Sequence, residues 1–176
     1  MRYRRARETG ATYFFTLNLA ERKHTILTDS ADILRATMQE VQQRYPFRID
    51  ALVILPDHLH AVWTLPPGDA DFPTRWMLIK SGFSRRIAPG ERRNVSRISK
   101  GERGIWQRRY WEHLIRDEED HARHVDYIHY NPVKHGYVKR AADWKYSSIH
   151  RYIKAGTLPC DWGSGKTIED GDFGER

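Results

Sequence analysis

The chain has 176 residues, the length of one domain that can bury a core of its own. Hydrophobic residues make up 39% and charged residues 30%, a composition that excludes a disordered or fibrous protein. The single Cys160 excludes an internal disulfide and favours a reducing compartment. No apolar run is long enough to span a membrane, and the first ten residues do not form a secretory signal. We therefore expect a cytoplasmic protein with no membrane partner.

Positive charge is unevenly distributed along the chain. The formal net charge is +7, and residues 160–176 carry five acids against two bases, which leaves residues 1–159 at +10. Four arginines lie within the first seven residues, and residues 85–109 hold nine lysines and arginines against two acids. This distribution favours a polyanionic partner, because phosphate contacts release counterions. The alternative is an ordinary solvated basic surface, and we expect nucleic acid.

The first predicted elements are a strand and a helix. Residues 12–19 are rich in aromatic and β-branched residues, which is typical of a strand. Ser30 is placed to cap a helix whose apolar residues recur at helical spacing. This helix is expected to end before Pro46, because the residue before proline disfavours the helical region.

Two strands joined by a tight turn are expected next. Residues 47–55 alternate in a strand pattern, which places five apolar residues on one face: Phe47, Ile49, Ala51, Val53 and Leu55. Pro56 and Asp57 are typical turn residues. Residues 58–65 resume the alternation, so the two segments predict a hairpin.

The second half of the chain predicts another helix, a loop, a strand and a third helix. Residues 73–87 have helical spacing, and residues 89–104 are polar, basic and glycine-bearing, as expected for a mobile loop. Residues 105–116 alternate as a fourth strand. Asp117 is placed to cap the third helix, which Asn131 and Pro132 are expected to end.

The order β-α-β-β-α-β predicts an α+β fold of the ferredoxin-like or RRM-like type. Helices would pack on an antiparallel sheet, and a tyrosine-bearing helix would be added toward the C-terminal end. Residues 141–153 are expected to form a further short helix. We expect residues 1–159 to form a single catalytic domain and residues 160–176 to be a disordered acidic tail.

His58 and His60 are the main candidates for a metal site. Residues two apart in a strand point to the same side, and these two share the side opposite an apolar set: Leu59, Ala61, Trp63 and Leu65. We therefore expect the apolar side to pack and the histidine side to be free. Imidazoles combine with oxygen donors to bind divalent metals. The alternative is that one ring bonds a backbone group and the other lies at the surface.

The third predicted helix carries a candidate nucleophile. At about 100° per residue, Tyr127 lies roughly opposite Val125 and away from the apolar side of the helix, so we expect it to face away from the core. Tyr130 is the second candidate. Asn131 lies one turn beyond Tyr127 and can offer a carbonyl oxygen to a hard cation. Its alternative role is that of a simple helix stop before proline.

Together these residues predict metal-assisted cleavage of a phosphodiester. Two imidazoles and an amide oxygen would hold Mg²⁺ or Mn²⁺, which polarises the phosphate. The oxygen of Tyr127 would displace a 3′-hydroxyl and form a 5′-phosphotyrosine, which conserves the bond energy for rejoining. A nearby base such as His124 is a candidate to accept the phenol proton.

The sequence motifs resemble those of the single-tyrosine HUH transposases, and most closely their REP-associated tyrosine transposase branch. The resemblance covers about residues 3–152 and lies in five blocks: YFFT at 13–16, LPDHLH at 55–60, WQRRYWEH at 106–113, YIHYNPVKHG at 127–136 and DWKYSS at 143–148. It implies an HUH transposase-like catalytic domain with His58 and His60 as metal ligands, Tyr127 as nucleophile and Asn131 as third ligand. Many relatives outside this branch carry glutamine where Asn131 stands.

The resemblance also implies cleavage and rejoining of single-stranded DNA at repetitive extragenic palindromes, which form hairpins, by a monomer rather than a dimer. From charge and placement alone, the candidate DNA contacts are Arg4, Arg5, Lys80, Arg85, Arg86, Arg108 and Arg109. Two other functions stay open. One is a non-catalytic protein that binds hairpin DNA or RNA on a four-stranded sheet. The other is a hydrolytic metalloenzyme that uses the histidines without the tyrosine.

Overall fold

A computed structural model describes residues 7–165 and 173–175 of the chain. Its elements, in chain order, are β1 (Thr12–Asn18), α1 (Ile26–Asp29), α2 (Ala31–Arg44), β2 (Arg48–Ile54), β3 (His58–Thr64), α3 (Phe72–Arg86), α4 (Val95–Ser99), β4 (Trp111–Leu114), α5 (Glu118–Lys134), the 3₁₀ helix η1 (Ala141–Asp143) and α6 (Ile149–Lys154). Among the described residues, no helix has both the length and the apolar composition needed to cross a membrane.

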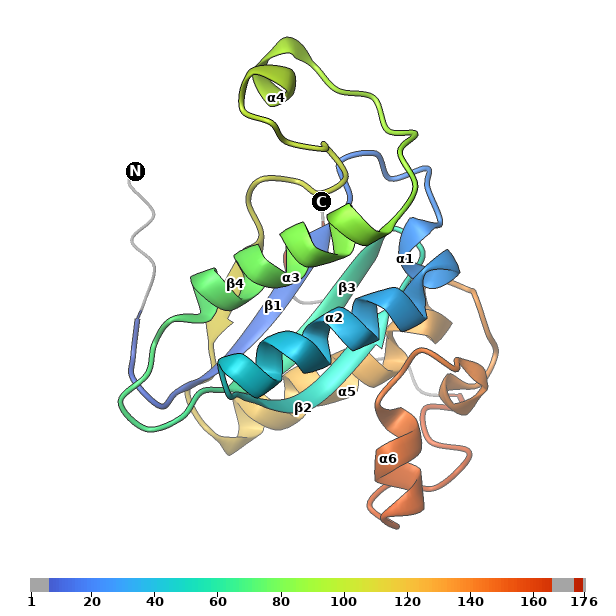
Figure 1. The fold of residues 1–176 in the computed structure, drawn as a ribbon. Helices are drawn as coiled ribbons and strands as arrows, with labels where there is room; N and C mark the ends of the chain where they lie inside the picture. Colours follow the sequence, from blue (N-terminus) through green and yellow to red (C-terminus); the bar gives the residue numbers. More distant parts are fainter. Residues whose placement is uncertain (1–6, 166–172, 176) are drawn as a thin grey trace.

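The four strands form one antiparallel sheet in the order β2-β3-β1-β4. Strand β1 is central and pairs with β3 from Thr12 opposite Thr64 to Asn18 opposite His58. Helices α2 and α3 cover one face of the sheet and α5 covers the other (Figure 1). This is the order of a split βαβ unit, so the predicted α+β fold is confirmed.

Each face of the sheet has its own core because successive strand residues point to opposite sides. Under α2 and α3, Trp63 of β3 stacks on Trp76 of α3 with ring centroids 3.9 Å apart. Under α5, Phe14 of β1 and Val62 of β3 pack against Ile128. The same alternation puts His58 and His60 on the α5 side.

Strand β2 departs from the single alternation expected for residues 47–55. A bulge between Ile49 and Ala51 inserts one residue into its pairing with β3. Phe47 and Ile49 therefore pack under α2 and α3, whereas Val53 and Leu55 pack under α5. A one-residue shift moves all later side chains to the other face, so the expectation of one apolar face was wrong.

Other boundaries also differ from the prediction. The fourth strand is shorter than expected, and Trp106 makes only an isolated bridge to Leu19. The segment expected to be a loop contains α4. Residues 141–153 form η1 and α6 instead of a single helix.

The observed ends of the helices match some of the predicted cap and stop residues and not others. Asp117 caps α5 as expected and accepts a hydrogen bond from the backbone of Asp120 at 2.8 Å. Ser30 occupies the N-cap position of α2 but makes no side-chain cap hydrogen bond. Helix α5 does not end at Pro132. Proline removes one backbone donor, and the turn after it is still closed by a 3.0 Å bond from His135 to the carbonyl of Asn131.

The end of the chain also differs from the expectation of a disordered tail over 160–176. Phe173 is only 3% exposed and belongs to the core under α5. Its carbonyl accepts a hydrogen bond of 2.6 Å from the hydroxyl of Thr16 on β1. Residues 166–172 and 176 lie outside the described part of the chain.

Candidate metal and nucleophile site

The four predicted site residues converge between β3 and α5. His58 and His60 project from β3, with ring centroids 5.0 Å apart, and the ring of Tyr127 on α5 lies 5.3 Å from that of His60. Asn131 follows one helical turn after Tyr127. All four residues are at most 2% exposed. The structure therefore brings together residues more than 65 positions apart in the sequence.

This burial corrects two expectations. The histidine side of β3 is not free, because α5 packs across it. Tyr127 does not face solvent, because its ring contacts Phe14 and stacks on Phe173. The helical wheel placed Tyr127 away from the apolar residues, but in the structure Tyr127 packs in the same core cluster as Val125 and Ile128.

Hydrogen bonds at Nδ1 orient both histidine rings. Nδ1 of His58 lies 2.7 Å from Oδ1 of Asp57. The hydroxyl of Thr16 donates its proton to the carbonyl of Phe173, so Nδ1 of His60, 2.8 Å away, must donate to Thr16. When the rings are neutral, both therefore present an unprotonated Nε2, which is the arrangement found in metal-ligating histidines.

The donor set fits a divalent cation. Within the described residues, the buried atoms Nε2 of His58 and Oδ1 of Asn131 have no hydrogen-bond partner. Nε2 of His60 lies 2.9 Å from Oε1 of Glu175. Burial lowers the pKa of His60 to about 4, so this ring is neutral at pH 7 and two acceptors face each other. Buried acceptors without donors are costly, and nitrogen and oxygen atoms together suit a divalent metal.

The carboxylate of Glu175 occupies the centre of this site. It accepts hydrogen bonds from the hydroxyl of Tyr127 and, at 2.7 Å, from Nδ2 of Asn131. Burial opposes the charge, but the nearby side chains of His135 and His58 hold the pKa of Glu175 well below its usual range. Burial also opposes a charge on His58, yet its hydrogen bond to Asp57 and the carboxylate of Glu175, 3.8 Å from Nε2, raise the pKa of its ring. Nε2 of His58 can therefore bind either a proton or a metal cation.

Sequence reasoning missed three residues here. Nζ of Lys134 lies 3.3 Å from the hydroxyl of Tyr127 and 3.1 Å from Oε2 of Glu175. Nε2 of His135 lies 3.4 Å from Oε2 of Glu175. Lys134 follows Tyr127 by seven residues, so helical spacing would have placed it on the same side. No sequence signal identifies Glu175, because 115 positions separate it from His60.

Two alternatives from the sequence lie outside the site. Tyr130 packs in a separate cluster with Trp162. Nδ1 of His124 lies 2.7 Å from the backbone carbonyl of Asp120, and burial lowers the pKa of its ring to about 4. With His113 these residues form a second group of possible metal ligands. The carboxylate of Asp120 is already bound by Arg123 at 2.9 Å and lies 2.7 Å from Nε2 of His113.

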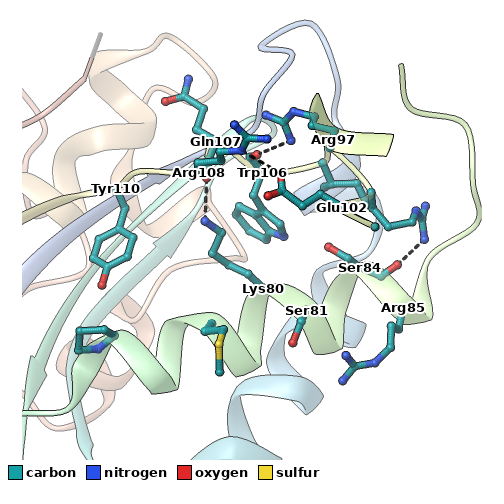
Figure 2. Close-up of a pocket in the computed structure, with 16 residues that line it drawn as sticks. Lys80, Ser81, Ser84, Arg85, Arg97, Glu102, Trp106, Gln107, Arg108 and Tyr110 are labelled. Atoms are coloured by element: carbon teal, nitrogen blue, oxygen red, sulfur yellow. Dashed lines mark hydrogen bonds and ion pairs between the residues drawn. The ribbon is translucent and has the colours of Figure 1, made fainter. Parts of the chain in front are cut away.

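The predicted DNA contacts are divided among different parts of the structure. Three line a pocket beside α3 (Figure 2), namely Lys80, Arg85 and Arg108. Arg86 pairs with Glu40 of α2 at 2.6 Å. Arg109 is exposed and does not line the pocket. Arg4 and Arg5 lie outside the described residues.

Comparisons with known proteins identify the family of this chain. Residues 9–131 match the family described as "Transposase IS200 like". The chain is 44% identical over 174 residues to the REP-associated tyrosine transposase of Escherichia coli (strain K12), a match that covers 99% of this chain and 96% of that protein. A solved structure of a REP-associated tyrosine transposase bound to a REP hairpin matches with a TM-score of 0.86 and 43% identity, over 100% of this chain and 98% of that one. The chain therefore belongs to the IS200-like transposase family and, within it, to the single-tyrosine enzymes of the REP-associated branch.

Proposed function

We propose that the protein cleaves and rejoins single-stranded DNA at REP-type hairpins through a covalent 5′-phosphotyrosine on Tyr127. The observation that carries this proposal is a shared contact. The hydroxyl of Tyr127 and Nε2 of His60 both contact Oε1 of Glu175, so nucleophile and metal-ligand candidates border the same small space. The hairpin substrate is inferred from the solved relative, which is described as bound to a REP hairpin.

His58, His60 and Asn131 would hold a divalent cation, Mg²⁺ or Mn²⁺. The partnerless Nε2 of His58 and Oδ1 of Asn131 support this assignment, as does the hydrogen bond that orients His60. When bound, the metal would polarise the scissile phosphate and stabilise its developing charge. A phosphate presents oxygens like those of a carboxylate, so the substrate must displace Glu175.

Two side chains of the protein would then catalyse the strand transfer. The oxygen of Tyr127 would bond to phosphorus as the bond to the 3′-oxygen breaks. The ammonium group of Lys134, 3.3 Å from that oxygen, would stabilise its negative charge as the phenol loses its proton. The 3′-hydroxyl end would later attack the phosphotyrosine and restore a phosphodiester.

The site residues described here come from one chain. This arrangement supports activity as a monomer, in which Tyr127 acts beside the histidines of its own chain.

A denaturing gel tests the proposal. The protein is incubated with Mn²⁺ and a 3′-labelled REP-type hairpin that has single-stranded flanks, since the label must stay on the fragment bound to tyrosine. The wild-type chain should form a covalent protein–DNA adduct and Tyr127→Phe none. Tyr130→Phe, the matched control, should keep the adduct.

Three outcomes would contradict parts of the proposal. An adduct formed by Tyr127→Phe would exclude this nucleophile. Cleavage without an adduct would indicate hydrolysis. Binding without cleavage, with the metal supplied, would indicate a non-catalytic protein that binds hairpin nucleic acid.

A further inference from the structure

A second possible binding site lies away from Tyr127. An open pocket of about 720 Å³ lies between α3 and the chain from 101 to 110 (Figure 2). Helix α3 covers the face of the sheet opposite α5, so the pocket is separate from the site at the histidines. Its volume lies within the range of about 300–1,000 Å³ that is common for small-ligand sites.

One part of the lining suits a planar base. Tyr110 provides partly exposed aromatic surface from the segment before β4, and Met77 of α3 is 59% exposed. Trp106 also borders the pocket, but it is only 6% exposed and packs against Phe83, with ring centroids 5.6 Å apart. Aromatic side chains bind unpaired bases by stacking, whatever the base.

Another part of the lining suits a phosphate. The pocket is lined by five cationic side chains and one acidic side chain: Lys80, Arg85, Arg97, Arg103, Arg108 and Glu102. Glu102 pairs with Arg108 at 2.9 Å. Lys80 donates to the backbone carbonyl of Gln107 at 2.7 Å, and Arg97 donates to that of Trp106 at 3.1 Å. Because a carbonyl is neutral, these hydrogen bonds do not neutralise the positive charge of either side chain. Arg85 is exposed at the pocket.

The backbone connects this pocket to the candidate catalytic site. The N–H of Gln107 bonds the carbonyl of Asn18 at 2.9 Å, and Asn18 lies opposite His58 in the β1–β3 pair. Neighbouring strands are about 4.8 Å apart, so the backbones of Gln107 and His58 are separated by about 10 Å. A few nucleotides of single strand can cover that distance.

We propose that this pocket binds one unpaired nucleotide of the single-stranded DNA. The base would lie against Tyr110 and Met77, and its phosphate would lie near Lys80 and Arg85. This inference rests on the proposed function, because it takes single-stranded DNA as the substrate. A nucleotide held here would fix the position of the strand relative to Tyr127.

Fluorescence anisotropy with two probes tests this binding mode. One probe is a labelled twelve-residue oligothymidylate, and the other is an abasic strand of the same length, which keeps the phosphates and removes the bases. All variants also carry Tyr127→Phe, so that only reversible binding is measured. The parent protein should bind oligothymidylate about tenfold more tightly than the abasic strand.

Two pocket variants should change this result in different ways. The Ser81 hydroxyl bonds only its own helix, so Ser81→Phe fills the pocket and should abolish the preference for bases. Arg85→Ala should weaken both probes and reduce the salt slope by about one unit, as expected for one lost phosphate contact. The control Arg44→Ala removes one exposed charge from α2, outside the pocket, and should change either affinity by less than about twofold.

The outcomes separate the two proposals. Circular dichroism checks that each variant folds. If Ser81→Phe does not fold, the milder Met77→Ala should reduce the base preference. An unchanged base preference in a folded pocket variant would overturn the inference, and adduct formation at Tyr127 would still support the proposed function. Base-dependent binding lost through the pocket variants would support the inference even if no adduct forms.

Discussion

The ring of Phe173 lies parallel to the ring of Tyr127, with 3.6 Å between their centroids and 14° between their planes. Two residues later, Glu175 bonds the phenol and lies 2.9 Å from Nε2 of His60. The end of the chain therefore covers Tyr127, the proposed nucleophile, with an apolar ring and places a carboxylate beside the metal-ligand candidates. Under the proposed function, residues 173–175 must leave before DNA can reach Tyr127.

Removal of this segment should speed the reaction. A chain that ends at residue 172 loses the ring over Tyr127 and the hydrogen bonds to Glu175, which together oppose substrate entry. Since a single hydrogen bond to a charged group is worth about 1.5–3 kcal/mol, we expect adduct formation to rise about tenfold or more. The initial rate of adduct formation with Mn²⁺ measures this change.

A single substitution separates the effect of the Glu175 carboxylate from that of the Phe173 ring. Glu175→Gln neutralises the carboxylate and keeps the stacked ring of Phe173, so its rate should fall between those of the full and truncated chains. A truncated chain that reacts no faster than the full chain would show that the end of the chain does not limit access.

Lys134 should contribute to the rate through its charge. Its ammonium group lies 3.3 Å from the phenol oxygen and 4.9 Å from the centre of the Tyr127 ring. Lys134→Ala removes a charged hydrogen bond to the reacting oxygen, and we expect single-turnover adduct formation to fall about 10- to 100-fold. Lys134→Arg keeps the charge and should recover part of the rate. Equal rates for the alanine and arginine variants would exclude a role for this charge.

Asp57 should increase metal affinity by orienting His58. The carboxylate accepts the Nδ1 proton of His58 at 2.7 Å and also binds Arg22. Loss of such an outer partner commonly costs about 10- to 100-fold in metal affinity, so Asp57→Ala should raise the Kd for Mn²⁺ at least about tenfold. Isothermal titration calorimetry with Mn²⁺ measures this Kd. Asp161→Asn, an exposed acid outside the site, should leave the Kd unchanged.

Local patterns in the sequence were enough to predict much of the fold and part of the site. The alternation of residues 58–65 places both histidines on one face, and the cap at Asp117 sets the start of α5. Helical spacing then places Asn131 near Tyr127. These signals come from neighbours within one element, which is why they can be read without knowing the tertiary packing.

The features that the sequence patterns did not predict depend on tertiary packing. The bulge at Ile49 depends on pairing with β3, and the burial of Tyr127 depends on what lies across from α5. Glu175 enters the site through contacts with β3 and α5 that no nearby motif encodes. The pocket beside α3 requires residues 101–110 to fold back onto that helix. Sequence charge alone therefore could not separate Lys80 and Arg85 from Arg86, which pairs with Glu40.

Buried neutral histidines should make the protein sensitive to acid. His129 is fully buried on α5, where Nε2 lies 2.9 Å from the hydroxyl of Ser148, and burial lowers the pKa of its ring to about 3. An unfolded histidine has a pKa of about 6.5, so between about pH 6.5 and 3 the unfolded chain binds the extra proton. In that window the free energy of unfolding falls as the pH falls, by up to about 1.4 kcal/mol per pH unit from this residue.

Urea unfolding at pH 7, 6, 5 and 4 in metal-free buffer measures that slope. His129→Gln keeps a polar partner for Ser148 but cannot take up the proton, so its stability should fall less steeply below pH 6.5 than that of the wild type. His121→Gln, on the same helix at a partly exposed position, should keep the wild-type slope. His60 and His124, whose pKa values burial also lowers to about 4, should sustain a residual slope in the His129 variant. If His129→Gln and the wild type lose stability equally between pH 6 and 4, the acid sensitivity does not arise from His129.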